Sequence, residues 1–129
     1  MVAYLDSSAL VKLVVREDET AALRAWLAGV PQCATSVLAR TEVIRAVRRA
    51  APELVEAAVE VCEALHLLAV PPAVFRDAAH LDPPELRSLD ALHLAAARLL
   101  GDELSSFVSY DTRLLAAAER LGMPVAAPA

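Results

Sequence analysis

Four acidic residues stand where this chain could do chemistry: Asp6, Glu42, Asp90 and Asp111. Asp6 directly follows the apolar run VAYL, and Asp111 directly follows SFVSY. Each therefore stands at the carboxyl end of a segment that is typical of a buried strand. Asp90 comes two residues after Ser88, at the start of a strongly apolar stretch, and Glu42 lies within TSVLARTEVIRAV.

Four carboxylates in one cleft would repel one another and raise one another's pKa values, and a divalent cation would neutralise that repulsion. A site made only of carboxylate oxygens selects hard cations such as Mg²⁺ or Mn²⁺ over Zn²⁺ or Cu²⁺. The net charge of the chain is −5, from 12 basic and 17 acidic residues, and without these four acids it would be −1. The sequence thus favours metal-assisted chemistry if the fold brings the four acids together.

Each acid also has a purely structural explanation when it is taken alone. Asp6 and Asp111 could each cap the helix that follows a strand. Asp90 would be favoured in the first turn of a helix by the helix dipole. Glu42 could pair with Arg45 on a solvated helix face. The metal-site hypothesis therefore depends on the four residues jointly.

The elements that would position these acids alternate between strands and helices. Strands are expected at 2–5, 32–35, 66–70 and 106–110, with an edge strand at 124–127, and helices at about 8–15, 20–28, 37–50, 52–65, 73–81, 88–100 and 112–121. This alternation predicts an α/β fold with a parallel sheet covered by helices on both faces. Ligands of such sheets bind beyond the carboxyl ends of the strands, where strand order reverses. Asp6 and Asp111 would converge there if the first and fourth strands are neighbours.

Composition bounds the remaining function classes. A chain of 129 residues without linker or repeat is expected to form one domain, residues 1–129. The three glycines are far apart in the sequence, which excludes a glycine-rich phosphate-binding loop. Cys33 and Cys62 lack metal-ligand spacing and indicate buried thiols in a reducing compartment. The N-terminal segment has no basic leader and is too short to span a bilayer, so a cytoplasmic protein without a membrane partner is expected.

All but one of the 12 basic residues are arginines, and they form no polybasic stretch. A function on nucleic acid would therefore need a local source of positive charge, such as a bound metal. Two groups of arginines could contact RNA phosphates, pair with carboxylates or lie in solvent: Arg87 with Arg113, and Arg45 with Arg48 and Arg49. His93, one turn after Asp90, shows no ligand spacing with the other histidines, which favours a packed or solvated side chain.

Four segments carry a resemblance to a known family: YLDSSALVKL, SVLARTEVIRAV, LRSLDALHLAAA and FVSYDTRLLAAAERLG. In this order and at this spacing they resemble the PIN-domain ribonucleases of the VapC type, the toxin half of bacterial toxin–antitoxin pairs, over essentially the whole chain. The resemblance implies a PIN-like three-layer α/β sandwich, with a central parallel sheet of four to five strands and about seven helices. The family's acid quartet falls on Asp6, Glu42, Asp90 and Asp111, and Ser8 matches a position where the family has Ser or Thr.

The activity implied by the resemblance is that of a Mg²⁺-dependent endoribonuclease, with Mn²⁺ as a substitute, that hydrolyses RNA phosphodiester bonds. Asp6 and Asp90 would ligate the metal most directly, and Asp111 and Glu42 would complete its shell or hold a second ion. Ser8 would orient a ligand or a water molecule. The resemblance also implies a cognate antitoxin that blocks the acidic pocket, a homodimer and a toxin–antitoxin hetero-oligomer.

Two alternatives remain open within the same fold: a DNA-directed PIN nuclease, and a non-catalytic PIN-fold module that only binds a partner or RNA. Aspartyl phosphotransfer is disfavoured. A haloacid-dehalogenase-type phosphatase needs a second Asp two residues after its nucleophile, where this chain has Ser8. A receiver domain needs a Lys after its last core strand, and the only lysine here is Lys12.

Overall fold

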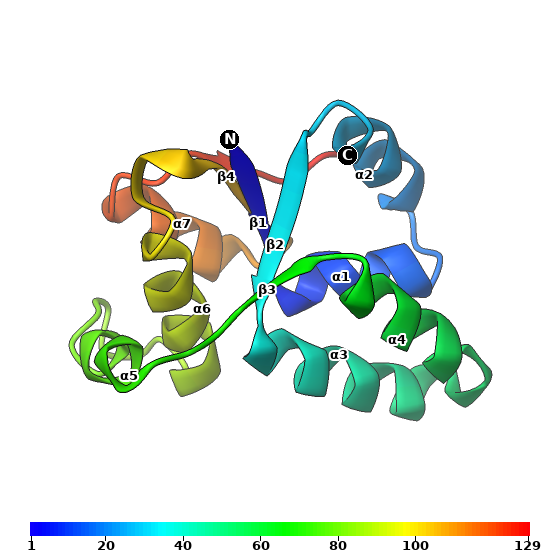
Figure 1. Cartoon of the computed structure of the whole chain (residues 1–129), viewed down its shortest axis with the longest axis horizontal. Coiled ribbons are helices and arrows are strands. Elements are labelled where there is room, and N and C mark those ends of the chain that lie inside the picture. The colour runs from blue at the N-terminus through cyan, green and yellow to red at the C-terminus, as the bar shows by residue number, and fades with distance from the viewer.

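A computed structural model describes all residues, 1–129, and shows strands and helices alternating along the chain (Figure 1). The strands are β1 (Val2–Leu5), β2 (Gln32–Ser36), β3 (His66–Leu68), β4 (Leu104–Val108) and β5 (Val125–Ala126). The helices are α1 (Ser7–Val14), α2 (Thr20–Leu27), α3 (Val37–Ala50), α4 (Val55–Glu63), α5 (Pro72–Ala78), α6 (Ser88–Arg98) and α7 (Thr112–Arg120). Short 3₁₀ turns cover Pro52–Leu54 and Gly101–Glu103.

The five strands form one parallel sheet in the order β3-β2-β1-β4-β5. Tyr4 of β1 is level with Ala34 of β2 on one side and with Phe107 of β4 on the other. The chain builds outward from β1 to β3 and then returns to place β4 against β1, so strand order reverses between β1 and β4. The prediction that the first and fourth strands are neighbours is confirmed, and so is the edge strand near the C-terminus.

Helices cover both faces of this sheet: α1 to α4 lie on one side, and α5, α6 and α7 on the other (Figure 1). Each side has its own cluster of buried apolar residues. The predicted three-layer α/β sandwich of the PIN type, with seven helices and five strands, is confirmed. Both cysteines are free, and none of the helices is long and apolar enough to cross a membrane.

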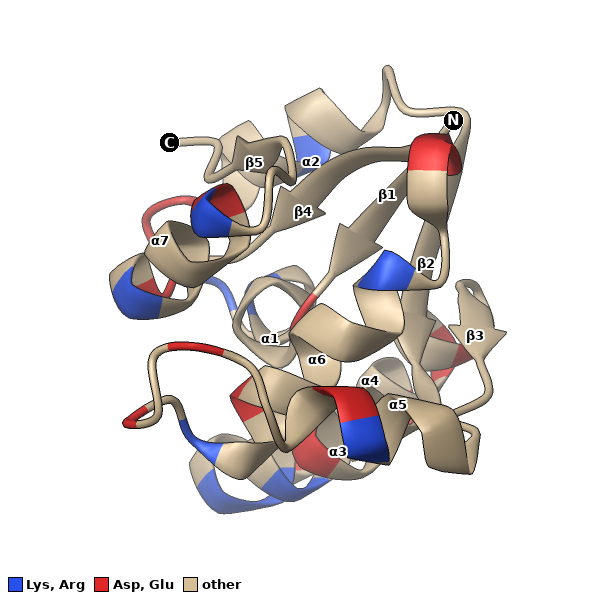
Figure 2. Cartoon of the chain, turned by 90° about the vertical axis from the view of Figure 1, so that its left-hand side faces the viewer, with Lys and Arg blue, Asp and Glu red and all other residues tan.

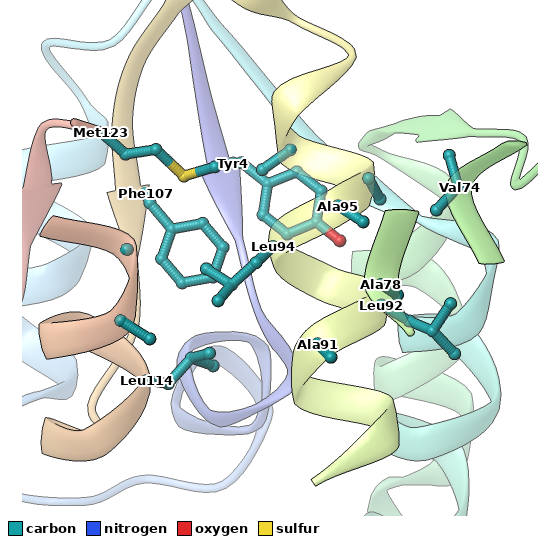
Figure 3. Packing of buried hydrophobic residues seen from close by; sticks show 14 of the residues in the cluster. Tyr4, Val74, Ala78, Ala91, Leu92, Leu94, Ala95, Phe107, Leu114 and Met123 are labelled. Carbon is teal, nitrogen blue, oxygen red and sulfur yellow. The ribbon is translucent and has the colours of Figure 1, made fainter. Parts of the chain in front are cut away.

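The core between the sheet and α6 rests on two aromatic rings and many small side chains (Figure 3). The rings of Tyr4 and Phe107 stack with their centroids 5.5 Å apart and their planes 7° from parallel. Helix α6 is buried from Ala91 to Ala97, and its alanines let it lie close to both the sheet and α5. This close packing fixes the height at which the N-terminus of α6, with Asp90, stands above the sheet edge.

Element ends differ from the expected ones by no more than three residues, and one of the differences matters for the site. The fourth strand runs from Leu104 to Val108 instead of 106–110, because its pairing with β1 begins at Val2 opposite Leu104. Ser109 and Tyr110 are thereby released from the strand and turn over the end of β1. The expected helix at 52–65 divides into the 3₁₀ turn and α4.

Candidate active site

The candidate site lies where β1 and β4 end side by side. The Asp6 amide still donates to the Val108 carbonyl at 3.1 Å, so the two strand ends are joined at this point. Asp6 then begins α1, and Asp111 begins α7 three residues after β4. Both acids accept hydrogen bonds from the first turn of their helix: Ala9 N donates to Asp6, and Arg113 N and Leu114 N donate to Asp111. Asp6 and Asp111 therefore cap their helices and also lie together at the ends of β1 and β4.

Asp6 is the most enclosed of the four acids, with only 4% of its surface exposed. Its Oδ1 accepts from the Ser8 hydroxyl at 2.7 Å and from the Ala9 amide at 3.0 Å, and its Oδ2 accepts from the Ser109 hydroxyl at 2.6 Å. Burial raises the pKa of Asp6, and these hydrogen bonds oppose the rise only in part. A bound cation would have the opposite effect, because it favours the charged carboxylate.

The raised pKa of Asp6 makes a prediction about stability in metal-free protein. Between the ordinary Asp pKa and the raised pKa of folded Asp6, the folded chain binds more protons than the unfolded chain, so this residue's contribution to stability falls as pH rises through that window. We expect the free energy of unfolding of the wild type, minus that of Asp6→Asn, to fall with pH over the same window. Asparagine also caps helices well, which keeps α1 in place. Urea titrations at a series of pH values measure the difference, and a difference that stays flat or rises would contradict the prediction.

Asp90 and Asp111 face one common cation, the guanidinium of Arg87. Arg87 Nε donates to Asp90 Oδ2 at 3.2 Å, and its Nη2 lies 3.8 Å from Asp111 Oδ2. Asp90 Oδ1 has no hydrogen-bond donor, and Asp111 Oδ2 has only this ionic contact, because the capping bonds of Asp111 go to its Oδ1. One positive group therefore already bridges these two acids.

Glu42 reaches the same edge of the sheet from the middle of α3. Its Oε1 accepts from the Ser7 hydroxyl at 2.8 Å and from His93 Nε2 at 2.6 Å. Burial raises the pKa of Glu42, but the hydrogen bond and charge of His93, the Ser7 hydroxyl and the charge of Arg87 outweigh it, so the pKa lies below its ordinary value. The pairing with Arg45 that the sequence left open is absent from this structure.

The four acids gather at one edge of the sheet, in two connected groups. Asp90 and Asp111 share Arg87, while Asp6 and Glu42 are held by the consecutive hydroxyls of Ser8 and Ser7. No three His, Cys, Asp or Glu side chains are placed to hold one ion together. Side chains must rotate before a third carboxylate can reach a cation between Asp90 and Asp111, and Arg87 must move first.

Three residues that the sequence did not select complete the arrangement: Ser7, Ser109 and His93. Ser109 Oγ donates to Asp6 and accepts from the Asp111 amide at 3.1 Å, so it couples the two strand-end acids. Ser7 lies between Asp6 and Ser8 in the segment YLDSSALVKL, but the pattern did not assign it a role. Nothing in the sequence pattern marked Ser109. His93 is packed, as expected, but its ring also contacts a site acid. Ser8, which was selected, donates to Asp6 and accepts from the Tyr110 amide at 2.9 Å.

Basic positions lie on α3 and on α7 (Figure 2), and arginines line two hollows of the surface. Arg87 and Arg113 line a cavity of about 720 Å³ together with Asp90 and Asp111. Arg45, Arg48 and Arg49 line a second hollow of about 270 Å³ on α3, with no other residue in its wall. The chain is acidic overall, yet Arg87 and Arg113 place positive charge in the same cavity as Asp90 and Asp111.

Comparisons with known proteins identify relatives of this chain. The family model for the PIN domain matches residues 3–120. The chain is 46% identical over 125 residues to Ribonuclease VapC46 of Mycobacterium tuberculosis, covering 97% of this chain and 96% of that protein. Among solved structures, the Mycobacterium tuberculosis toxin VapC20, described as cleaving the sarcin-ricin loop, has a TM-score of 0.76 at 19% identity and covers 89% of this chain and 94% of its own. A toxin–antitoxin complex from Klebsiella pneumoniae has a TM-score of 0.74 at 22% identity and covers 98% of both chains.

Proposed function

The chain belongs to the PIN-domain family, with VapC ribonucleases as its relatives, and from this premise we propose that it is a Mg²⁺-dependent endoribonuclease that acts as the toxin of a toxin–antitoxin pair. The observation that carries the proposal is the position of Arg87, a single cation that bridges Asp90 and Asp111 where strand order reverses. A metal ion in that place would find carboxylate oxygens, the donors that Mg²⁺ and Mn²⁺ prefer.

The proposed ligand set is the acid quartet of the family, and its carboxylate oxygens differ in how many structural donors they already have. Asp90 keeps Oδ1 free and Glu42 keeps Oε2 free, while Asp111 turns Oδ2 toward Arg87. Asp6 stands behind them with both oxygens already hydrogen-bonded, which fixes its orientation. We assign Asp6 and Asp90 as the most direct ligands, and Asp111 and Glu42 as completing the shell or holding a second ion. The bound ion would then neutralise the repulsion between the four carboxylates.

The chain's own groups orient this site. Ser8 and Ser109 hold the two oxygens of Asp6, while Ser7 and His93 hold one oxygen of Glu42, so neither carboxylate rotates freely. A bound Mg²⁺ would lower the pKa of a water molecule and offset charge on the scissile phosphate. Because water and not the ribose 2′-hydroxyl attacks, the products should carry 5′-phosphate and 3′-hydroxyl ends.

Cleavage of total RNA by the purified protein, with Mg²⁺ or with EDTA, tests this function. We expect cleavage only with Mg²⁺, and ligation-based end mapping should recover 5′-phosphate and 3′-hydroxyl products. Products with 2′,3′-cyclic phosphate would refute the mechanism. Matched RNA and DNA strands belong in the same experiment, since preferential cutting of DNA would make the protein a DNA-directed nuclease. A protein that binds neither Mg²⁺ nor Mn²⁺ would be a non-catalytic module.

The proposed partners follow from the same family. The structurally similar Klebsiella pneumoniae chain comes from a toxin–antitoxin complex, and we propose that a cognate antitoxin covers the acidic edge here and silences it. Homodimers and toxin–antitoxin hetero-oligomers are the corresponding assemblies. RNA as the substrate and two free cysteines both fit a protein that works in the cytoplasm.

Arg87 competes with a metal for Asp90 and Asp111, which gives a second prediction. Arg87→Ala removes one positive charge less than 4 Å from both acids and should tighten Mn²⁺ binding roughly fivefold to tenfold. Calorimetric titration measures the affinity. Arg98→Ala is the matched control. The side chain of Arg98 also pairs with an aspartate, Asp77, at 3.4 Å, but this pair lies away from the site. Unchanged or weaker Mn²⁺ binding by Arg87→Ala would show that Arg87 does not occupy the cation position.

A further inference from the structure

A cavity opens directly beside Asp90 and Asp111. It measures about 720 Å³ and lies between α7 and the segment that leads into α6. In Figure 2 these two parts face each other, and both carry charges of either sign. A cavity of this size accommodates a small organic ligand or one nucleotide.

One face of α7 forms a wall of this cavity with an ordered pattern. Arg113, Ala116, Ala117 and Arg120 recur at i, i+3, i+4 and i+7, which places them on the same side of the helix. Two guanidinium groups therefore flank a shallow floor of alanine. The two arginines are about 10 Å apart along the helix axis, so they reach different groups of one ligand.

The two arginines of this wall are free to bind a ligand. Arg113 and Arg120 are exposed and form no ion pair within the chain, whereas Arg87 and Arg98 are both paired. The opposite wall adds apolar surface from Pro83 and Leu86. Cations for phosphate, small apolar surface for a base or ribose, and two carboxylates for a metal thus meet in one cavity.

We propose that this cavity binds the nucleotide next to the scissile phosphate of single-stranded RNA, with Arg113 and Arg120 holding the backbone phosphate and the base. The inference rests on the proposed function, because the scissile phosphate must lie at the metal that Asp90 and Asp111 help to hold. The cavity adjoins these acids, so the nucleotide next to the scissile phosphate can enter it. No aromatic side chain lines the wall, and the guanidinium planes are the groups on which an unstacked base can lie.

Binding of RNA under non-cleaving conditions tests this directly. A fluorescently labelled single-stranded RNA of mixed sequence is titrated with protein in EDTA over a range of salt concentrations. The double variant Arg113→Ala/Arg120→Ala should bind about tenfold more weakly. With one arginine on the phosphate and the other on the base, its slope of log K against log salt should shrink by about 0.7, the contribution of one phosphate contact on a single strand. Arg16→Ala/Arg76→Ala is the matched control, because both residues are exposed, without an ion pair, and outside the cavity.

A second variant separates shape from charge. Ala116→Leu fills the alanine floor without changing the charge and should weaken binding while leaving the salt slope unchanged. In cleavage assays with Mg²⁺, both variants should raise KM and leave kcat nearly unaltered, because neither touches the acids.

Three outcomes would overturn the inference. If the wild type cleaves RNA and the double variant matches the control in affinity, KM and salt slope, this inference fails and the proposed function stands. If the variant keeps RNA binding but loses the antitoxin, the cavity belongs to the protein partner. A wild type that neither binds nor cleaves RNA overturns the inference together with the proposed function.

Discussion

Replacing Asp90 by asparagine is expected to slow Mg²⁺-dependent RNA cleavage by more than about 100-fold, because even groups that only support metal ligands cost 10-fold to 100-fold when they are removed. Asparagine keeps the size of the side chain, and its carbonyl oxygen can still accept from Arg87, so the N-terminus of α6 should stay in place. What is lost is the negative charge that opposes Arg87 and attracts the metal. The rate at which an intact target RNA disappears from total RNA measures the effect.

Asp77→Asn is the matched control for this variant. Asp77 is also an aspartate paired with an arginine, but it lies on α5 and pairs with Arg98 on the surface. The control should cleave RNA at the wild-type rate, and both variants should unfold at nearly the wild-type temperature. Cleavage by Asp90→Asn within threefold of the control would remove Asp90 from the ligand set. Calorimetry with Mn²⁺ should show the same ordering of the variants, which separates a loss of metal from a loss of substrate.

The fold could be predicted because its strongest signals are local. An apolar run that stops at an acid marked β1, and apolar residues at helical spacing marked α1. The alternation of these elements then restricted the sheet to a parallel one covered on both faces. Strand ends were less certain because pairing decides them: the start of β4 at Leu104 follows from its register with Val2, which lies over one hundred residues away in the chain.

The positions of the acids could be predicted, but their partners could not. The sequence pattern placed Asp6 and Asp111 at the ends of strands. Because β1 and β4 are neighbours in the sheet, both residues lie at the same edge. By contrast, the hydrogen bond from Ser109 to Asp6 joins residues 103 positions apart, and the one between His93 and Glu42 joins residues 51 apart. Such contacts depend on the height and rotation of packed helices, and periodicity within one element carries no information about either.

His93 shows how closely the core and the candidate site are joined. It has 1% of its surface exposed, and its Nδ1 lies 2.7 Å from the Tyr4 hydroxyl. Burial raises the pKa of Tyr4, so its hydroxyl keeps its proton within this hydrogen bond. Because a carboxylate can only accept, His93 Nε2 carries a proton and donates to Glu42 at 2.6 Å. A tyrosine stacked in the core on Phe107 thus orients the donor that holds a site carboxylate.

His93→Ala is therefore expected to lower the free energy of unfolding by about 3 kcal/mol or more, because it leaves a cavity, a buried hydroxyl without its partner and a carboxylate without one of its two donors. Tyr4→Phe removes only the hydroxyl and should cost about 1–2 kcal/mol. His80→Ala, at an exposed histidine after α5, should stay within about 0.5 kcal/mol of the wild type. Urea denaturation of the three variants measures these differences.

The double variant Tyr4→Phe/His93→Ala tests whether the two residues act as one unit. Once His93 is gone, the Tyr4 hydroxyl has lost its hydrogen-bond partner. Removing the hydroxyl should then cost less stability than in the wild type, or even restore stability. The costs of the single variants should consequently exceed that of the double variant when they are added. Strict additivity, or a His93→Ala protein as stable as His80→Ala, would show that the ring does not join Tyr4 to Glu42. Cleavage adds an independent readout, since Tyr4→Phe leaves the donor to Glu42 in place and should retain far more activity than His93→Ala.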